Sequence, residues 1–359
     1  MSSLLYRPDF DQVRDRLTDW WRGGDIGRPA MHITVRRSEP LEDIPVLPEP
    51  DGWVTHYSTS DFDYRVNLST RACVNAHYLA DAVPTVAPDL APNCLALYQG
   101  CNGVEMPGTV WCKPCIESPE TARFGFDPDN FYWDFTLRLS REQLRLGQGK
   151  FLVAFPDLIE GLDSLAAMRG TDKLLIDLIE RPGWVHQSLQ TLTDLYFQYY
   201  DILYDMYKED RGGSHFWAWA PGRMAKLQCD FSAMISPEMF GEFMVPVLRE
   251  MTAKFDHCMY HWDGPGAIPH HDHLLALPDL DMIQWTPGSG VETIADRRWW
   301  PLYHKTIEAG KKVALLGFHG IDNLIAFKRE FGPKIKQCLI ATSAESLDQA
   351  EEILHIVSD

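Results

Sequence analysis

Short, continuously apolar segments alternate along the chain with longer segments in which apolar residues recur at helical spacing. The clearest apolar segments cover residues 30–35, 151–155 and 312–317, and each precedes a segment with a helical pattern. Continuous hydrophobicity is typical of strands that are covered on both faces, as in a parallel sheet with helices packed outside it. We therefore expect an α/β fold.

The pattern contains about eight strand–helix units, which is the number that closes a (β/α)8 TIM barrel. We predict strands at 30–35, 83–87, 151–155, 214–219, 257–261, 281–285, 312–317 and 338–341. We predict helices at 4–22, 61–81, 129–147, 161–180, 183–208, 236–255, 268–276, 296–309, 322–330 and 346–357. An open doubly wound sheet is the alternative, but no G-x-G-x-x-G follows any predicted strand.

The predicted barrel forms a single domain over 1–359 with three additions. Residues 1–30 form an N-terminal helical extension, and 38–60 and 94–120 are excursions between barrel elements. The second excursion contains alternation around 104–111 that predicts an inserted hairpin. The helix at 236–255 has the strongest start signal, with Ser236 at the N-cap and Pro237 directly after it.

Composition narrows the function classes. The chain has 33 Lys and Arg against 51 Asp and Glu, a formal charge of −18, which argues against binding nucleic acid or anionic membrane surfaces. No stretch approaches the ~18 uninterrupted apolar residues of a membrane span. The first residues lack a signal-peptide pattern, so we expect a cytoplasmic protein whose eight cysteines are thiols. The sequence is compatible with a monomer and with a homodimer.

In a barrel of this kind the active site lies at the carboxyl ends of the strands. The predicted strand ends carry a set of polar and aromatic residues that we take as the candidate site: Asp89, Asp157, Glu160, Trp217, Trp219, Cys229, Asp230, His261, Asp263, Trp285, His319, Thr342, Ser343 and Glu345.

His261 and Asp263 form the sharpest feature of this set. They lie two residues apart at a strand end, so that both side chains point to the same face of the extended chain. Imidazole and carboxylate are ligands for zinc and also suit proton transfer. A pair that only shapes the following turn is the alternative.

His319 and the Cys229–Asp230 pair are further candidates. His319 lies between Gly317 and Gly320 and could either meet a ligand or cap the next helix. Asp230 is a candidate catalytic group, whereas a buried Cys229 is as easily a small apolar residue. Cys112 and Cys115 have C-x-x-C spacing, but no second pair lies nearby, and we interpret them as structural.

Several segments together resemble the uroporphyrinogen decarboxylase-like superfamily. The most similar branch is that of the corrinoid-linked methyltransferases, which includes proteins labelled trimethylamine corrinoid protein 2. The resemblance covers nearly the whole chain and depends on the segments 20–29, 109–114, 227–232, 235–246, 260–267 and 283–288. It implies a (β/α)8 barrel, and it is less specific for the reaction.

The resemblance also implies a zinc site that this chain reproduces only in part. In the methylcobalamin-dependent methyltransferases, a His-x-Cys motif and a later Cys hold a zinc ion that activates a thiol. His261 matches the His, but Asp263 stands in place of the Cys, and 341–345 lacks the later Cys. A set of His261 and Asp263 with Glu345 or His319 would hold a metal with less thiolate character.

The decarboxylases of the superfamily hold a tetrapyrrole with cationic groups near the first strand and an aspartate after the second. Arg36 and Arg37 lie near the first position, and Asp89 resembles the second. The histidine at the last strand is absent, and the tyrosine after the third strand is not evident. Decarboxylation of a porphyrinogen is therefore disfavoured.

Three hypotheses follow. The first is a methyltransferase that moves a methyl group between a small donor or acceptor and a corrinoid (cobalamin) on a partner protein, with a methylated cation held against Trp217, Trp219 or Trp285. The second is a lyase or decarboxylase of a small carboxylated substrate, with Arg36 or Arg37 as the anion clamp. The third is a non-catalytic binder of a corrinoid or another small ligand.

Overall fold

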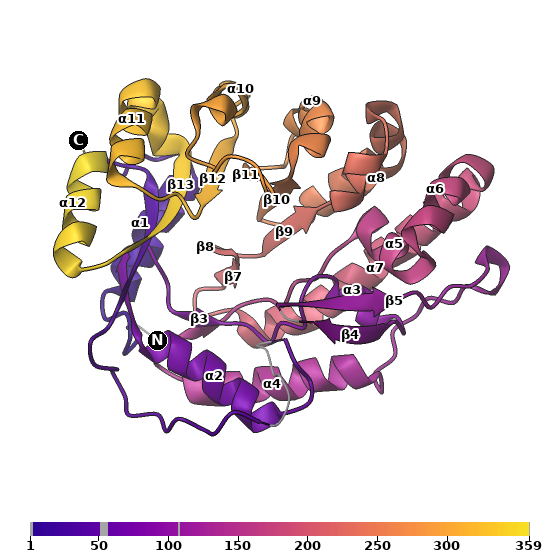
Figure 1. The fold of residues 1–359 in the computed structure, drawn as a ribbon, viewed down its shortest axis with the longest axis horizontal. Coiled ribbons are helices and arrows are strands. Elements are labelled where there is room, and N and C mark those ends of the chain that lie inside the picture. Colours follow the sequence, from indigo (N-terminus) through magenta and orange to yellow (C-terminus); the bar gives the residue numbers. More distant parts are fainter. Residues whose placement is uncertain (1–2, 51–56, 107, 359) are drawn as a thin grey trace.

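A seven-stranded, mostly parallel sheet organises the molecule (Figure 1). The computed structural model describes residues 3–50, 57–106 and 108–358. The strands lie in the order β2 (Ala76–Ala80), β1 (Ala30–Arg36), β13 (Cys338–Ala344), β12 (Lys312–Leu316), β11 (Met282–Thr286), β10 (His257–Asp263) and β9 (Met224–Gln228). All neighbours pair in parallel except β2, which runs antiparallel to β1 at one edge.

Three short two-stranded ladders complete the strands of the described residues. They are β3 (Thr85–Val86) with β6 (Leu152–Val153), β7 (Ser214–Phe216) with β8 (Ala218–Ala220), and the hairpin of β4 (Asn102–Met106) and β5 (Thr109–Lys113). The Phe155 amide donates to the His215 carbonyl at 3.0 Å, and the Met224 amide donates to the Ser214 hydroxyl at 3.0 Å. These bonds continue the arc of strands beyond β9 (Figure 1).

The sheet is not closed by one continuous ladder within the described part of the chain. The predicted closure of about eight strand–helix units into a barrel is therefore not shown, and the observed arrangement is a seven-stranded sheet with short ladders beside it. The α/β class and the mostly parallel pairing are confirmed. The inserted hairpin around 104–111 is also confirmed as β4 and β5.

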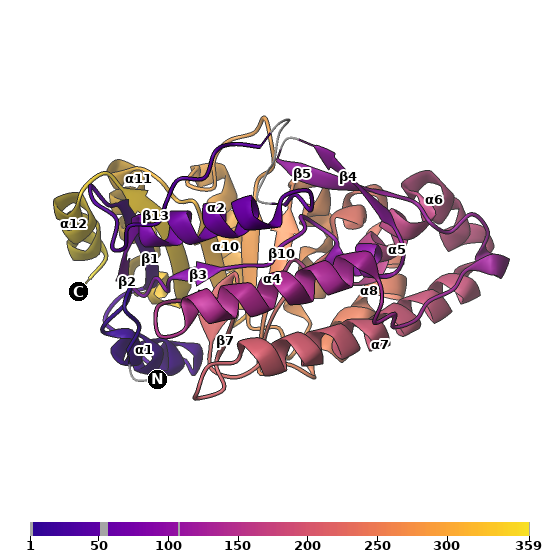
Figure 2. The same ribbon diagram turned by 90° about the horizontal axis from the view of Figure 1, so that it is seen from below.

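Helices lie outside the arc of strands (Figures 1 and 2). The α-helices are α1 (Phe10–Trp21), α2 (Phe62–Val74), α3 (Cys94–Tyr98), α4 (Phe131–Gly147), α5 (Gly161–Arg169), α6 (Thr171–Glu180), α7 (Pro182–Tyr207), α8 (Pro237–Thr252), α9 (His271–Leu275), α10 (Trp300–Glu308), α11 (Ile321–Phe331) and α12 (Leu347–Val357). The Ser236 side chain caps α8 by accepting a hydrogen bond from the Met239 amide, as its start signal predicted.

Several predicted elements differ from the structure, among them the helix expected over 161–180, which is interrupted at Gly170 and forms α5 and α6. The helix expected over 61–81 ends at Val74, and the residues after it form the edge strand β2. The strand expected over 214–219 folds back on itself as β7 and β8, and the parallel strand of this region is β9. Because β9 contains Lys226 and Gln228, it lacks the continuous apolar run from which the other strands were predicted.

Helix α1 lies across the amino ends of several strands. The indole of Trp20 donates to the Lys336 carbonyl just before β13, and that of Trp21 donates to the Trp219 carbonyl in β8. The Trp21 ring also packs on His257 at the start of β10, with ring centroids 4.5 Å apart. The N-terminal segment therefore covers the end of the sheet opposite to the strand carboxyl ends. None of the described helices combines the length and the apolar character needed to cross a bilayer.

Candidate functional site

Polar side chains line one face of three neighbouring strands near their carboxyl ends. His261 of β10 is paired in register with Gln228 of β9 and with Gln284 of β11. Because side chains alternate along a strand, Lys226 and Asp263 point to the same side as these three residues. The interior of the sheet therefore carries polar groups here.

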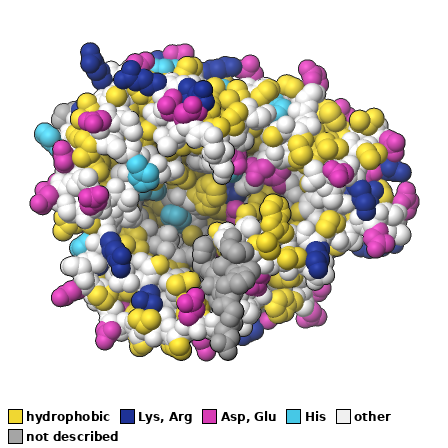
Figure 3. Space-filling model, viewed as in Figure 1, with side chains coloured by type: hydrophobic (Ala, Val, Ile, Leu, Met, Phe, Trp, Pro, Cys, Tyr) yellow, Lys and Arg dark blue, Asp and Glu magenta, His cyan; other side chains and the backbone are white. Residues whose placement is uncertain are grey.

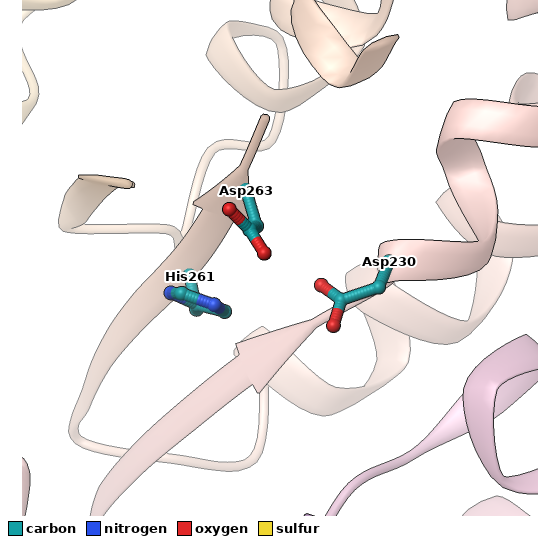
Figure 4. Close-up of side chains that lie close together, drawn as sticks. All are labelled: Asp230, His261 and Asp263. Atoms are coloured by element: carbon teal, nitrogen blue, oxygen red, sulfur yellow. The ribbon is translucent and has the colours of Figure 1, made fainter. Parts of the chain in front are cut away.

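Three of the predicted residues converge at this point. Each of Asp230, His261 and Asp263 offers a ligand atom, and these atoms all lie within 4.8 Å of one another. Figure 4 shows the two β10 side chains facing Asp230, which begins a short 3-10 helix directly after β9. The two-residue spacing on β10 and the end of the adjacent strand bring the three groups together.

Gln284 fixes the tautomer of His261. The amide nitrogen of Gln284 donates to the Trp285 carbonyl at 2.8 Å and to the Thr286 hydroxyl at 2.9 Å, so its oxygen faces Nδ1 of His261. That oxygen only accepts, so Nδ1 carries the hydrogen and Nε2 keeps a free lone pair. Burial and then the charge of Lys226 lower the pKa of His261, which keeps the ring neutral at neutral pH.

The carboxylates of the site are crowded. Burial, followed by the charges of Asp163 and Asp263, raises the pKa of Asp230 to about 7. Asp163 of α5 accepts hydrogen bonds from the Asp230 and Phe231 amides, both at 2.8 Å, and so holds the loop after β9 in place. Oδ1 of Asp263 is buried without a hydrogen-bond partner in the described part of the chain. A cation would relieve both the repulsion and the unpaired oxygen.

Lys226 is a functional candidate that the sequence interpretation missed. Its side chain is 0% exposed, forms an ion pair with Asp157 and donates to the Gln228 amide oxygen. A lysine this deep in a sheet is rare unless it is paired. The available signal was the polar alternation of Lys226, Gln228 and Asp230, which is typical of a strand with one polar face.

The predicted residues Asp89, Asp157 and Glu160 lie around this lysine. Burial, opposed by the charge of Lys226, raises the pKa of Glu160 to about 8. Oε1 of Glu160 accepts a hydrogen bond from the backbone amide of Gln228 at 2.7 Å. Burial and then Asp157 raise the pKa of Asp89 to about 6, and its carboxylate accepts from the Asp157 amide at 3.0 Å. The three acids belong to the same polar interior as His261.

Trp217 also lies in this interior, in an uncommon backbone conformation. It has φ +62°, which is disfavoured for a bulky residue and occurs between β7 and β8. Its ring meets that of His261 edge to face with centroids 5.0 Å apart. The ammonium of Lys226 lies 4.7 Å from the Trp217 ring centroid. The Trp217 ring therefore already has a cation–π contact with a protein side chain, the ammonium of Lys226.

The other two tryptophans and Cys229 are placed away from the converging groups. Trp219 is 2% exposed and packs on Phe10 of α1, on the covered side of the sheet. Trp285 is 1% exposed and packs on Trp262 and Trp299, because it points to the outer face of β11. Cys229 is buried, and burial raises the pKa of its thiol. The expectation that both tryptophans line the mouth is corrected by their positions.

His319 and Glu345 lie on the exposed rim beside β12 and β13. Nδ1 of His319 is 3.5 Å from the Thr342 hydroxyl, and the backbone of Glu345 donates to the Gln349 side chain at 2.7 Å. Both residues are exposed, and neither belongs to the converging set among the described residues. In that set Asp230 takes the position that the sequence interpretation gave to Glu345.

A cavity of about 500 Å³ adjoins the site. Its walls include Asp163, Gln228 and Asp230 on one side and Trp111 and Cys112 of the β4–β5 hairpin on the other. In the space-filling view this face of the molecule is hollowed near its centre (Figure 3). Another cavity of about 540 Å³ lies between α2, α4 and the segment around Glu42, and none of the converging residues lines it.

The donor set fits a divalent cation of the kind that accepts nitrogen and oxygen ligands. One imidazole and two carboxylates are regular zinc ligands, and three protein ligands leave a position open for a substrate. The hydrogen bond from His261 to Gln284 is the type of outer contact that orients a ligating imidazole. The crowded carboxylates and the unpaired oxygen of Asp263 agree with this interpretation.

Comparison with solved structures identifies the class of fold. The structure is similar to that of a methyltransferase from Methanosarcina mazei, with a TM-score of 0.59 and 11% sequence identity. The similarity covers 96% of this chain and 97% of that one. At this identity it establishes a shared fold over nearly the whole length. No family model matches the chain, and no curated protein matches its sequence.

Proposed function

We propose that the protein is a methyltransferase that moves a methyl group between a small substrate and a corrinoid, or a similar carrier, presented by a partner protein. The observation that carries the proposal is the convergence of Asp230, His261 and Asp263 at the strand carboxyl ends. The end-to-end fold similarity to a methyltransferase supports the same reaction class. The open, barrel-like arc of strands would present these groups at one end, where a large carrier can approach.

The residues of the site have distinct roles in this proposal. His261 is neutral and offers Nε2, so it can take a proton from the substrate or hold a cation. Asp230 and Asp263 supply the negative charge that completes a cation site, for which zinc is our candidate. When bound, such a cation lowers the pKa of a coordinated heteroatom and so makes it a better nucleophile or leaving group.

Lys226 and Asp157 position the polar side chains of β9 that lie next to these groups. Their ion pair and the bond from Lys226 to Gln228 keep the β9 side chains in one arrangement. Because Lys226 lies over the Trp217 ring, and Trp219 and Trp285 point elsewhere, the structure offers little support for a tryptophan cage around a cationic methyl donor. Contacts to carboxylates are the better-supported way to hold such a donor.

A lyase acting on a small carboxylated substrate is the second candidate, and Lys226 is the observation that favours it. The buried ammonium of Lys226 can pair with a substrate carboxylate if that carboxylate displaces Asp157 from the ion pair. The arginines first considered for this role are less suitable. Arg36 is exposed at the end of β1, and Arg37 donates to the Ala76 carbonyl at 3.1 Å.

The absorption spectrum of a Co(I) corrinoid, followed after adding protein and methylated amines, thiols or ethers, tests the proposal. We expect methylation of cobalt with the wild type and a loss of about 100-fold or more in rate for His261→Ala. His319→Ala is the matched control, because this exposed histidine lies outside the converging set, and it should keep the wild-type rate. Release of CO₂ without corrinoid would instead favour the lyase. Ligand-induced stabilisation without turnover would identify a binder.

A further inference from the structure

Three cysteines that are separate in the sequence meet beside the β4–β5 hairpin. Cys101 follows α3, Cys112 lies in β5, and Cys115 comes just after β5. The sulfur atoms of Cys101 and Cys115 are 3.5 Å apart, and the Cys112 thiol also contacts Cys101. The structure thus adds a third thiol to the C-x-x-C pair, which the spacing alone made appear isolated.

The three thiols differ in accessibility. Cys101 is buried, Cys112 is half-buried, and Cys115 is exposed. The hydrogen bond that the Cys101 thiol can donate to either sulfur lowers the pKa of Cys112 and of Cys115, which favours a thiolate at one of the two. The other five cysteines, Cys73, Cys94, Cys229, Cys258 and Cys338, are all buried. An external reagent would therefore meet Cys115 first.

The arrangement suits a disulfide better than a metal. A disulfide has an S–S distance near 2.05 Å, so side-chain rotations that bring the two sulfur atoms about 1.5 Å closer would join Cys101 to Cys115. The backbone at both positions is already held, because the Cys101 amide donates to Ala96 and the Cys115 amide donates to Met168. Among the described residues, the three sulfur atoms do not form a group within 4.8 Å of one another, as one shared ion would require.

We propose that Cys115 and Cys101 form a covalent modification site for low-molecular-weight disulfides. The Cys115 thiolate attacks one sulfur of the reagent RS–SR, forms a mixed disulfide Cys115–S–SR and releases RS⁻. The Cys101 thiol then loses its proton and attacks the Cys115 sulfur, which gives the Cys101–Cys115 disulfide and a second RS⁻. The two protein thiols are oxidised, and the reagent is reduced to two thiols.

The site borders the cavity next to the candidate active site. Trp111 and Cys112 line that cavity together with Asp230. A link between Cys101 and Cys115 would tie the end of β5 to the end of α3 and so fix one cavity wall. The modification therefore connects the thiol redox state of the surroundings to the shape of this space, whichever reaction the site performs.

Treatment of the full-length protein with oxidised glutathione tests the proposal. The chain has eight cysteines, and one disulfide removes two thiols, so the count after denaturation should fall from eight to six. Peptide mapping should then join the peptides of Cys101 and Cys115. Cys101→Ser should stop at one glutathione attached to Cys115, and Cys115→Ser should remain unmodified. Cys112→Ser is the matched control and should still form the link.

Two outcomes would overturn the proposal. One is a wild-type protein that keeps all eight thiols under conditions in which an exposed cysteine peptide reacts. The other is a link that maps to Cys112, or one that is lost in Cys112→Ser. Since mapping of the wild type decides the pairing by itself, a variant that fails to fold does not remove the test.

Discussion

The two faces of β10 and β11 differ in what they are built from. On the inner face His261, Asp263 and Gln284 form hydrogen bonds or approach other polar groups. On the outer face Trp262 and Trp285 are buried against each other with centroids 4.8 Å apart. Residues adjacent in sequence therefore have unrelated roles, one chemical and one in packing. The difference predicts that substitutions on one face change binding and those on the other change stability.

Trp285→Ala should have the largest effect, and it should act on stability. Removal of a buried indole leaves a cavity and is expected to lower the free energy of unfolding by about 3–5 kcal/mol. Urea denaturation would measure this loss. Because the side chain points away from His261, the affinity of the remaining folded protein for Zn²⁺ should stay unchanged. A selective loss of Zn²⁺ or substrate binding without destabilisation would contradict the two-face description.

Asp263→Ala should give the reverse result. It removes one of the two carboxylates of the converging set. Substitution of a residue that only orients a metal ligand lowers metal affinity by roughly 10–100-fold, so loss of a ligand itself should lower the Zn²⁺ affinity, measured by equilibrium dialysis, by more than that. Stability of the metal-free protein should change little or rise, because the variant removes a crowded carboxylate. Glu345→Ala is the matched control, and equal losses in both variants would exclude a specific site.

Gln284→Leu should weaken the same site by a smaller amount. Leucine has a similar size but cannot accept the hydrogen bond from His261, so the ring loses its fixed orientation. We expect Zn²⁺ affinity to fall by about 10–100-fold. Thr286→Val is a milder control, because it removes only one of the two acceptors of the Gln284 amide. If both variants bind Zn²⁺ as the wild type does, the orienting role of Gln284 is wrong.

Glu160→Gln should change the pH dependence of stability. Burial raises the pKa of Glu160 to about 8, so the folded protein keeps a proton that the unfolded chain releases above its ordinary value of 4.5. The free energy of unfolding should therefore fall as the pH rises from about 5 to 8. Without this carboxyl the fall should be smaller by about 1 kcal/mol or more. Thermal unfolding across this range would measure the slope, and Glu351→Gln on the exposed side of α12 should leave it unchanged.

The sequence predicted the elements of the fold better than their assembly. Apolar runs at 257–261, 281–285 and 312–317 correspond closely to β10, β11 and β12. Closure of the sheet depends on hydrogen bonds between strands far apart in the chain, and a local pattern carries no information about it. Lys226 was missed for a related reason, since the strands were predicted from continuous apolar runs, and a buried lysine fits such a strand only once its partner Asp157 is known.

The same limit applied to the site. His261 and Asp263 were singled out because a two-residue spacing at a strand end specifies a shared face, and Asp230 because it lies in the loop after the strand predicted at 214–219. Trp219 and Trp285 were misplaced, because the inward side of a strand is known only once its ends and register are fixed. Cys101 was not connected to Cys112 and Cys115, since its contact depends on the packing of α3 against the hairpin.

Helix α1 has a consequence for the order of events. Because Trp20 and Trp21 attach it to the amino ends of the strands, a substrate reaches the polar interior of the sheet from the strand carboxyl ends. In the proposed reaction the small methylated compound has to enter before the bulky carrier protein covers the strand carboxyl ends, and both are bound when the methyl group moves to cobalt. Initial rates should then follow ordered sequential kinetics, with intersecting double-reciprocal lines.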